Sequence, residues 1–486
     1  MSPSQILSDE WFTLEVFAQM LKALDPKLVQ DIITIDIPDA DNKALLLAAI
    51  ALWLKNGALA PFHVVVVNRR FSSENAAGVF NPETKTFSFE ETPGAKPVEL
   101  DTKSFLAAKL KEGPNEVYDL EDERMLLGIN VASLRALVRD AFPDVNLDSI
   151  HFYNGGTAAV GGIGPCVHKT EWKFFKGVGQ GIMEHTSFEG PVELATAAEI
   201  HEFDAAWLAL RPDERSAFLK AAFEAIPPNL RYTIPLLPLE HSDDSSPKKQ
   251  RTEGGSAPAY APEVRALVDF AEGGGVFRVF SGAPLTGAVA LPEVVRHRVV
   301  YLAAMFGALD DGSKNVLKGN FNHVVDEPAA EKLMGGAYFP NARVVFFPTN
   351  FFKTAFPTPD GVCNEVCTLP AATIAAVKET SKPLQWIAAL VAQWTALNPR
   401  GLQPLFDVAV LFDLLTSARL FKIFATAGLV GPKLVHKGET KSWIDEAAPF
   451  PKGFYTVDAN GLDGVEGGNF AFEARNVLSV FFADLF

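Results

Sequence analysis

Residues Ile32–Phe71 read IITIDIPDADNKALLLAAIALWLKNGALAPFHVVVVNRRF, and this stretch decides the fold class. It begins with an apolar strand, IITIDI, passes through an acidic turn and continues as an apolar helix over about Asn42–Leu54. The run HVVVV (His63–Val67) is almost continuously β-branched, as expected of a strand buried in a parallel sheet. Strand, helix and strand in so short a length form a βαβ unit. We therefore expect Ile32–Ile37 and His63–Val67 to be adjacent parallel strands joined by the helix.

The acidic turn contains three aspartates, Asp36, Asp39 and Asp41. Carboxylates at the carboxyl end of a first strand are suited to hold a divalent cation and a sugar. The same carboxylates also suit the start of a helix, where negative charge is favourable. Both explanations, a metal site and a charged helix start, stay open at this point.

Helix and strand alternate again in the second half of the chain. A helix at about Pro262–Ala271 is followed by the strand VFRVFSG, a helix, the strand RVVYLAAM, the helix EPAAEKLMG and the strand ARVVFFPT. We expect mainly helices from there to the C-terminus. This alternation indicates a parallel sheet flanked by helices. The predicted fold class is therefore α/β, with one mostly parallel sheet that begins at Ile32 and a large insertion in the middle of the chain.

The middle region, residues 72–258, has weaker patterns. NPETKTFSFEETPG (81–94) predicts a hairpin, MLLGINVASLRALVRDAF (125–142) a helix, and DAAWLALRPDERSAFLKAAFEAI (204–226) a helical pair. The glycine-rich stretch FYNGGTAAVGGIGPCVH (152–168) lacks the GxxxxGK[ST] spacing that cradles phosphates. We interpret it as a turn-rich connection.

The clearest low-complexity segment is HSDDSSPKKQRTEGGSAP, residues 241–258. Its polar composition cannot bury a core, so it predicts a mobile surface loop rather than a nuclear-localisation patch at PKKQR. The chain then divides into an N-terminal helical extension (1–31), a core (32–71 and 259–486) and an inserted or elaborated region (72–258).

Composition excludes several classes of partner. The chain has 486 residues, 48% hydrophobic and 21% charged, with a net charge of −16. This negative charge argues against nucleic acid and anionic membranes as partners. No apolar stretch reaches the roughly 18 residues of a membrane span, and the start lacks the features of a secretory signal. Three cysteines suit a reducing compartment, and Cys363 and Cys367 have no further zinc ligand near them, so we expect a cytoplasmic protein.

Phenylalanine is abundant, with 38 residues against 7 tyrosines and 7 tryptophans. The simpler explanation is a large core packed with aromatic rings. The other is an exposed surface for self-association, because large apolar patches mark interfaces.

Four segments, in order along the chain, carry a resemblance to a known family. They are DIPDADN in the acidic turn, VFRVFSGAPLTGAVALPEVVRHRVVYLAAMFGA (276–308), GNFNHVVDEPAAEKL (319–333) and PLFDVAVLFDLL (404–415). Together they resemble the DxDPGxDD, GPLTN and MGGA, EFN and HDPLA motifs of the nucleoside hydrolases, the inosine–uridine-preferring N-ribohydrolases. The resemblance covers somewhat more than half of the chain.

The resemblance implies cleavage of an N-glycosidic bond. In that family calcium, held by aspartates, positions the ribose hydroxyls and activates the attacking water, and an aspartate beside the motif's proline is the general base. Anchored on Pro38, the base corresponds to Ile37, and the aspartate two positions before it to Ile35. The two aspartates after the motif's glycine correspond to Asp41 and Asn42.

The remaining motifs are also altered. The Glu of EFN corresponds to Asn320, although Asn322 persists, and the His of HDPLA corresponds to Phe406, although Asp407 persists. The Asn of GPLTN is replaced by Gly287. The acidic turn therefore resembles the remains of a metal site.

The candidate residues follow from these correspondences. By strand alternation Asp36 points away from the face of Ile35 and Ile37, and it can replace the base only if the turn is rearranged. His323, Asn154 and His168 each have a plainer explanation, as surface or loop residues. The candidates are Asp36 and Asp41 for catalysis, Asp39, Asn322 and His323 for ligand binding, and Asp41 and Asp407 for a metal if one is bound.

Two functions are consistent with these residues. The first is a nucleoside-hydrolase-like protein that is catalytically impaired and reused for binding or self-assembly, with no cofactor. The alternative is an active nucleoside N-ribohydrolase with a rebuilt site, which would require Ca²⁺. The partners expected are a small nucleoside or ribosyl ligand and further copies of the chain, with neither nucleic acid nor membrane.

Overall fold

The structure is a computed structural model of the 486-residue chain. It describes residues 25–36, 40–58, 61–68, 79–81, 86–89, 98–101, 120–157, 193–200, 212–237, 260–306, 308–310, 314–316, 322, 326–334, 337–347, 381–397, 407–414, 429–430, 454–457 and 485.

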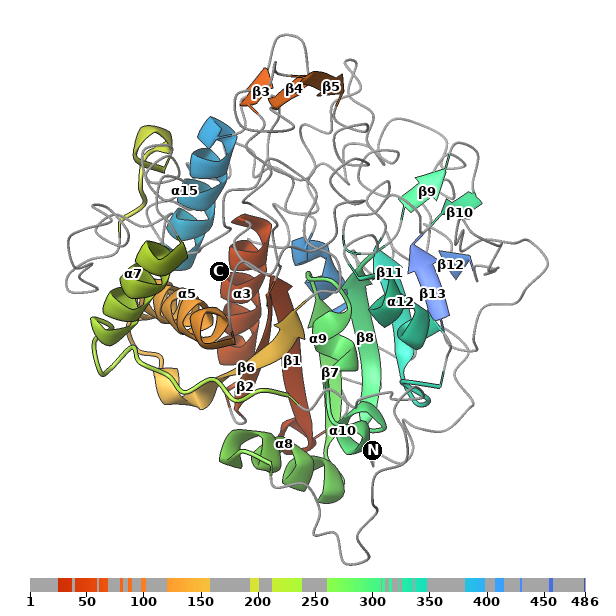
Figure 1. The fold of residues 1–486 in the computed structure, drawn as a ribbon. Helices are drawn as coiled ribbons and strands as arrows, with labels where there is room; N and C mark the ends of the chain where they lie inside the picture. Colours follow the sequence, from red (N-terminus) through yellow and green to blue (C-terminus); the bar gives the residue numbers. More distant parts are fainter. Residues whose placement is uncertain are drawn as a thin grey trace, which may run out of the picture.

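Within this part of the chain, eight strands form one sheet in the order β12-β13-β11-β8-β7-β1-β2-β6 (Figure 1). Every neighbouring pair is parallel except β12 with β13, so the predicted α/β class with a mostly parallel sheet is confirmed. The strands are β1 (Val29–Asp36), β2 (Phe62–Asn68), β6 (Ile150–Thr157), β7 (Val276–Ser281), β8 (Val299–Met305), β11 (Arg343–Phe347), β12 (Leu429–Val430) and β13 (Phe454–Val457).

The predicted βαβ unit is present. Strands β1 and β2 are parallel neighbours, with Ile32 opposite His63 and Asp36 opposite Val67, and α3 (Ala40–Lys55) connects them. Strand β1 begins at Val29, after the short 3₁₀ helix η1 (Pro26–Leu28), so the expected N-terminal helix does not extend to residue 31. Residues 1–24 of that helix lie outside the described residues.

One prediction about the sheet is wrong. The start of the glycine-rich stretch is not a connection, because β6 extends through residue 157 and pairs with β2. Its glycines allow close packing: a Cβ on Gly155 would lie 2.6 Å from Val65 Cγ1 and 3.0 Å from Gly287 Cα. In the C-terminal part, β13 joins the sheet beside β11, a strand that the sequence did not predict.

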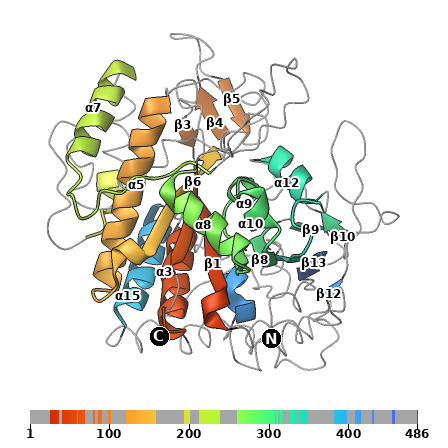
Figure 2. The same ribbon diagram turned by 90° about the horizontal axis from the view of Figure 1, so that it is seen from below.

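Helices cover both faces of the sheet, and Figure 2 shows α3 and α15 on the opposite side of the strands from α9 and α10. Side chains of α3 pack in one apolar cluster with those of α5, α15 and the 3₁₀ helix η4, and side chains of α8, α9, α10 and α12 pack in the other. The bounds are α5 (Leu120–Ala141), α15 (Lys382–Leu397), η4 (Asp407–Leu414), α8 (Pro262–Glu272), α9 (Thr286–Val289), α10 (Glu293–Arg296) and α12 (Glu327–Met334). None of the described helices is long and apolar enough to cross a membrane.

The 72–258 region supplies part of this core. Besides β6 it contributes α5, whose Leu127, Val131 and Leu134 are buried in the cluster around α3, and α7 (Pro212–Glu224), which packs on α5. The predicted hairpin at 81–94 is present as β3 (Val79–Asn81) and β4 (Thr86–Phe89), which β5 (Val98–Asp101) extends. The remaining short elements are η2 (Leu147–Ser149), β9 (Ala308–Asp310) and β10 (Lys314–Val316). The predicted loop at 241–258 lies outside the described residues.

The order of the strands reverses between β1 and β7. From β1 the chain proceeds to β2 and β6 toward one edge, and from β7 to β8, β11 and β13 toward the other. In open α/β sheets the crevice at the carboxyl ends of the strands, at such a reversal, is the usual place for a ligand. The carboxyl ends of β1 and β7 are therefore the expected place for a ligand in this sheet.

Candidate functional site

The carboxyl end of β1 is joined to the start of α3 by a pair of side chains. Asp36, the last residue of β1, is buried, and its Oδ1 accepts a hydrogen bond from Asn42 Nδ2 at 2.6 Å. In return, the backbone N–H of Asp36 donates to Asn42 Oδ1 at 3.2 Å. These two bonds fix the first turn of the helix against the end of the strand.

Asp41 lies in the same first turn and is also buried. Its Oδ1 accepts a hydrogen bond from the backbone N–H of Asn42 at 3.2 Å. A carboxylate in this position is favoured by the unsatisfied N–H groups of the helix start. The contacts of Asp36 and Asp41 are therefore those expected if the acidic turn is a charged helix start.

The carboxyl end of β7 is held to β1 by a second set of hydrogen bonds. Thr34 Oγ1 donates to Ser281 Oγ at 2.6 Å, and the hydroxyl of Ser281 donates to the backbone oxygen of Ala283 at 3.0 Å. The backbone N–H of Gly282 donates to the oxygen of Thr34 at 3.0 Å. The polar groups of both strand ends therefore form one buried layer.

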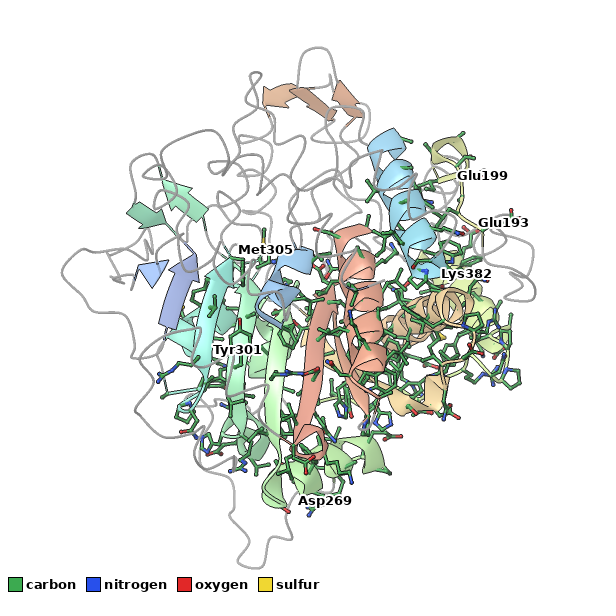
Figure 3. The ribbon with its side chains drawn as sticks, turned by 180° about the vertical axis from the view of Figure 1, so that it is seen from behind. Glu193, Glu199, Asp269, Tyr301, Met305 and Lys382 are labelled. Carbon is green, nitrogen blue, oxygen red and sulfur yellow. The ribbon has the colours of Figure 1, made fainter. Side chains whose placement is uncertain are left out.

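Asn322 and Asp407 both lie against Gly282, the residue that follows β7. The Nδ2 of Asn322 donates to the backbone oxygens of Gly282 at 3.1 Å and of Met305 at 3.0 Å, and so links β7 to β8. A Cβ on Gly282 would lie only 2.8 Å from Asp407 Cγ and 2.9 Å from Leu45 Cδ2. Glycine is therefore required for the carboxylate to approach the end of the strand. Figure 3 shows Met305 at this end of β8 and Tyr301 farther down the same strand.

The described candidate residues lie in this layer. Asp36 and Asp41 both contact Asn42, and Asn322 and Asp407 both contact Gly282. Asp39 and His323 lie outside the described residues, as does His168.

Ile35 and Asn154 have structural roles and are not part of the polar layer. Ile35, which corresponds to a family aspartate, is buried in the apolar cluster around α3. Asn154 accepts a hydrogen bond from the backbone N–H of Gly156 at 2.9 Å, and its own backbone bonds Pro235 and Leu237, so the structure places it in a β-bridge.

Several residues that build the layer were not identified from the sequence as contributors. Asn42 appeared only as a lost aspartate, and Gly282, Thr34 and Ser281 carried no signal because their partners are distant in the chain. Thr286 and Asp326 are a similar case. The Thr286 hydroxyl donates to the Asp326 carboxylate, which also accepts the backbone N–H of Ala329 at 3.1 Å and so begins α12.

The donor atoms of this layer do not fit a calcium ion of the kind that the family resemblance implies. Calcium takes six to eight oxygens, several of them anionic. Here Asp36, Asp41 and Asn42 direct oxygens to one another's N–H groups, and the oxygens of Gly282 and Met305 accept from Asn322. Among the described residues, no three His, Cys, Asp or Glu side chains are grouped so that they could hold a metal ion.

A second buried polar group lies on the neighbouring strands β1, β2 and β6. His63 is placed between Tyr153 Oη, 3.0 Å from its Nδ1, and Gln30 Oε1, 2.9 Å from its Nε2. Burial, and to a lesser degree the neighbouring His151, lower the pKa of His63 to about 3. Because both ring nitrogens have hydrogen-bond partners, the neutral imidazole fits a structural role here.

Comparisons with known proteins leave the family open. No protein-family model matches the chain, and no curated protein matches its sequence. Among solved structures, the effector protein XOO4466 matches with 12% identity and a TM-score of 0.39 over 97% of this chain and 99% of that chain. The type III effector XopQ, complexed with adenosine diphosphate ribose, matches with the same identity and TM-score over 98% and 99%. Likenesses this distant carry no argument about function, and the α/β fold rests on the sheet of this chain itself.

Proposed function

We propose that this protein is nucleoside-hydrolase-like and binds a ribosyl ligand at the carboxyl ends of β1 and β7 without hydrolysing it. The observation that supports this is the buried polar layer at the point where the strand order reverses. Carboxylate and amide groups held in fixed positions are suited to recognise the hydroxyls of a sugar.

We propose that catalysis is impaired because Asp36, the candidate general base, is already hydrogen-bonded within the protein. A general base must reach the attacking water within hydrogen-bond distance. One oxygen of Asp36 is already held by Asn42 at 2.6 Å, and Ile35 is packed in the apolar core. The described residues around them provide no group of three metal ligands to activate a water instead.

Calorimetry with ribose, inosine, uridine and ADP-ribose tests the binding proposal, and a ribose-release assay with the two nucleosides tests the loss of hydrolysis. We expect heat of binding for at least one ribosyl compound and no release of ribose. Asn322→Ala should abolish the binding, because it removes the link between β7 and β8.

Asn341→Ala is the matched control. Asn341 also donates to a backbone oxygen, that of His297 at 2.9 Å, but it is exposed and precedes β11, at the opposite end of that strand from the proposed site. Ribose release that depends on Asp36 would instead establish the alternative, an active hydrolase. A lack of binding by all four compounds would contradict the proposal and leave self-assembly, which size-exclusion chromatography with light scattering measures directly.

A further inference from the structure

Lys43 is a fully buried lysine in the first turn of α3. Its side chain is 1% exposed, which places it among the largest completely buried side chains of the described residues. It directly follows Asn42, the residue that binds Asp36 at the end of β1. Lysine is almost never buried to this extent unless its charge is compensated.

The position of Lys43 in the first turn of α3 increases the need for a negative charge close to its ammonium group. The N-terminus of a helix carries a partial positive charge, so a lysine in the first turn is disfavoured there. Removing an ammonium group from water has an additional cost of several kcal/mol, which only nearby opposite charge can offset. Neither the solvent nor the helix provides that charge.

Three buried carboxylates at the same end of the sheet are the candidates to provide it. Asp36 and Asp41 are 1% and 7% exposed and belong to the strand end and helix start that flank Lys43. Asp407 is 4% exposed and begins η4, which packs against α3. Neither Lys43 nor any of these three carboxylates is without a partner in the fold. A nearby cation lowers the cost of burying carboxylates, and the donor atoms around these three do not fit calcium.

We infer that the ammonium group of Lys43 is the resident cation of this polar layer. It neutralises buried carboxylates that a divalent metal would otherwise neutralise, and it makes this end of the sheet independent of metal. The inference concerns the protein without ligand, so it stands or fails separately from ribosyl binding.

Thermal unfolding with calcium and with EDTA tests the inference first. The melting temperature of the wild-type protein should be the same in both. Lys43→Asp removes the cation and adds a carboxylate, so its melting temperature should be lower in EDTA and should rise with calcium. Lys55→Asp, at the exposed C-terminal end of the same helix, should show no calcium-dependent rise.

Double-mutant cycles provide a second test in case Lys43→Asp does not fold. Lys43→Met should lower the melting temperature, whereas Lys43→Arg, which keeps the charge, should lower it less. Combined with Asp36→Asn, Asp41→Asn or Asp407→Asn, the loss should be smaller than the sum of the single losses for at least one pair. Stabilisation of the wild type by calcium, or additive losses in all three cycles, would overturn the inference.

Discussion

At the scale of single residues, Gly282 governs the approach of Asp407 to the strand ends. Gly282→Ala would place a methyl group 2.8 Å from Asp407 Cγ and 2.9 Å from Leu45 Cδ2. Overpacking of this kind lowers the free energy of unfolding by about 1–3 kcal/mol, and urea denaturation measures it. Gly273→Ala is the control, because its nearest contact is a backbone oxygen at 3.2 Å and a smaller loss is expected. A Gly282→Ala protein as stable as the wild type would show that Asp407 can move aside freely.

His63 predicts how stability depends on pH. Its pKa is about 3 in the folded protein and 6.5 in the unfolded chain, so the unfolded chain binds more protons between these values. The stability that neutral His63 contributes is therefore complete above pH 6.5 and falls by roughly 1.4 kcal/mol for each pH unit below it. Urea unfolding from pH 7.5 to 4.5 should show a shallower fall for His63→Gln than for the wild type. The same replacement of His297, whose side chain is 45% exposed, is the control.

Sequence could identify some residues of the polar layer but not their partners. Asp36 stood out as a carboxylate at the end of a predicted strand, and Asn322 and Asp407 stood out through the resemblance to the nucleoside hydrolase motifs. Asn42 and Gly282 did not, because a glycine's role depends on which side chain approaches it, and Asp407 is 125 positions away from Gly282 (407 − 282). The direction of a carboxylate at a strand end is likewise decided by the turn that follows it.

At the scale of elements, Asp140 joins α5 to α15. Its carboxylate accepts hydrogen bonds from Trp386 Nε1 at 2.7 Å and from Lys382 Nζ at 3.1 Å. Figure 3 shows Lys382 at the end of α15 that lies next to α5. Asp140→Ala leaves the largely buried indole N–H without its acceptor, so we expect a loss of about 1–3 kcal/mol in urea unfolding. Asp269, which pairs with Arg265 at 2.6 Å on the exposed side of α8, is the control. Asp269→Ala should leave the free energy of unfolding unchanged within error. Equal losses in the two variants would contradict the role of Asp140 in joining α5 to α15.

Helices and strands could be predicted from the sequence where one hydrophobic pattern dominated the segment. The β-branched run of β2 and the apolar α3, which is buried on nearly all sides, are clear because burial demands continuous hydrophobicity. Strand β6 was missed because close packing against β2 required glycines, which also signal turns. The four-residue strand β13 is too short to show a period.

At the scale of the whole molecule, the sheet depends on the 72–258 region. Strand β6 covers the edge of β2, and α5 buries its leucines against α3. A chain that lacks residues 72–258 should therefore lose the cooperative unfolding transition, because both the edge of β2 and one side of α3 would be exposed. Circular dichroism in urea measures this, and a cooperative transition in the shortened chain would show that the region is dispensable.

The reversal of strand order also has a consequence for biosynthesis. Thr34 and Ser281, which share a hydrogen bond, are 247 positions apart, and Asp407 joins them from still farther along the chain. The ribosome therefore releases the first strand long before its partner β7 exists, and contacts so distant in sequence form slowly. Until residue 407 has emerged, Asp36 and Asp41 are without the third buried carboxylate of their layer. A nascent chain interrupted before that point cannot complete its polar layer. The last third of the protein is therefore needed before the strand end and helix start in the first third have all their contacts.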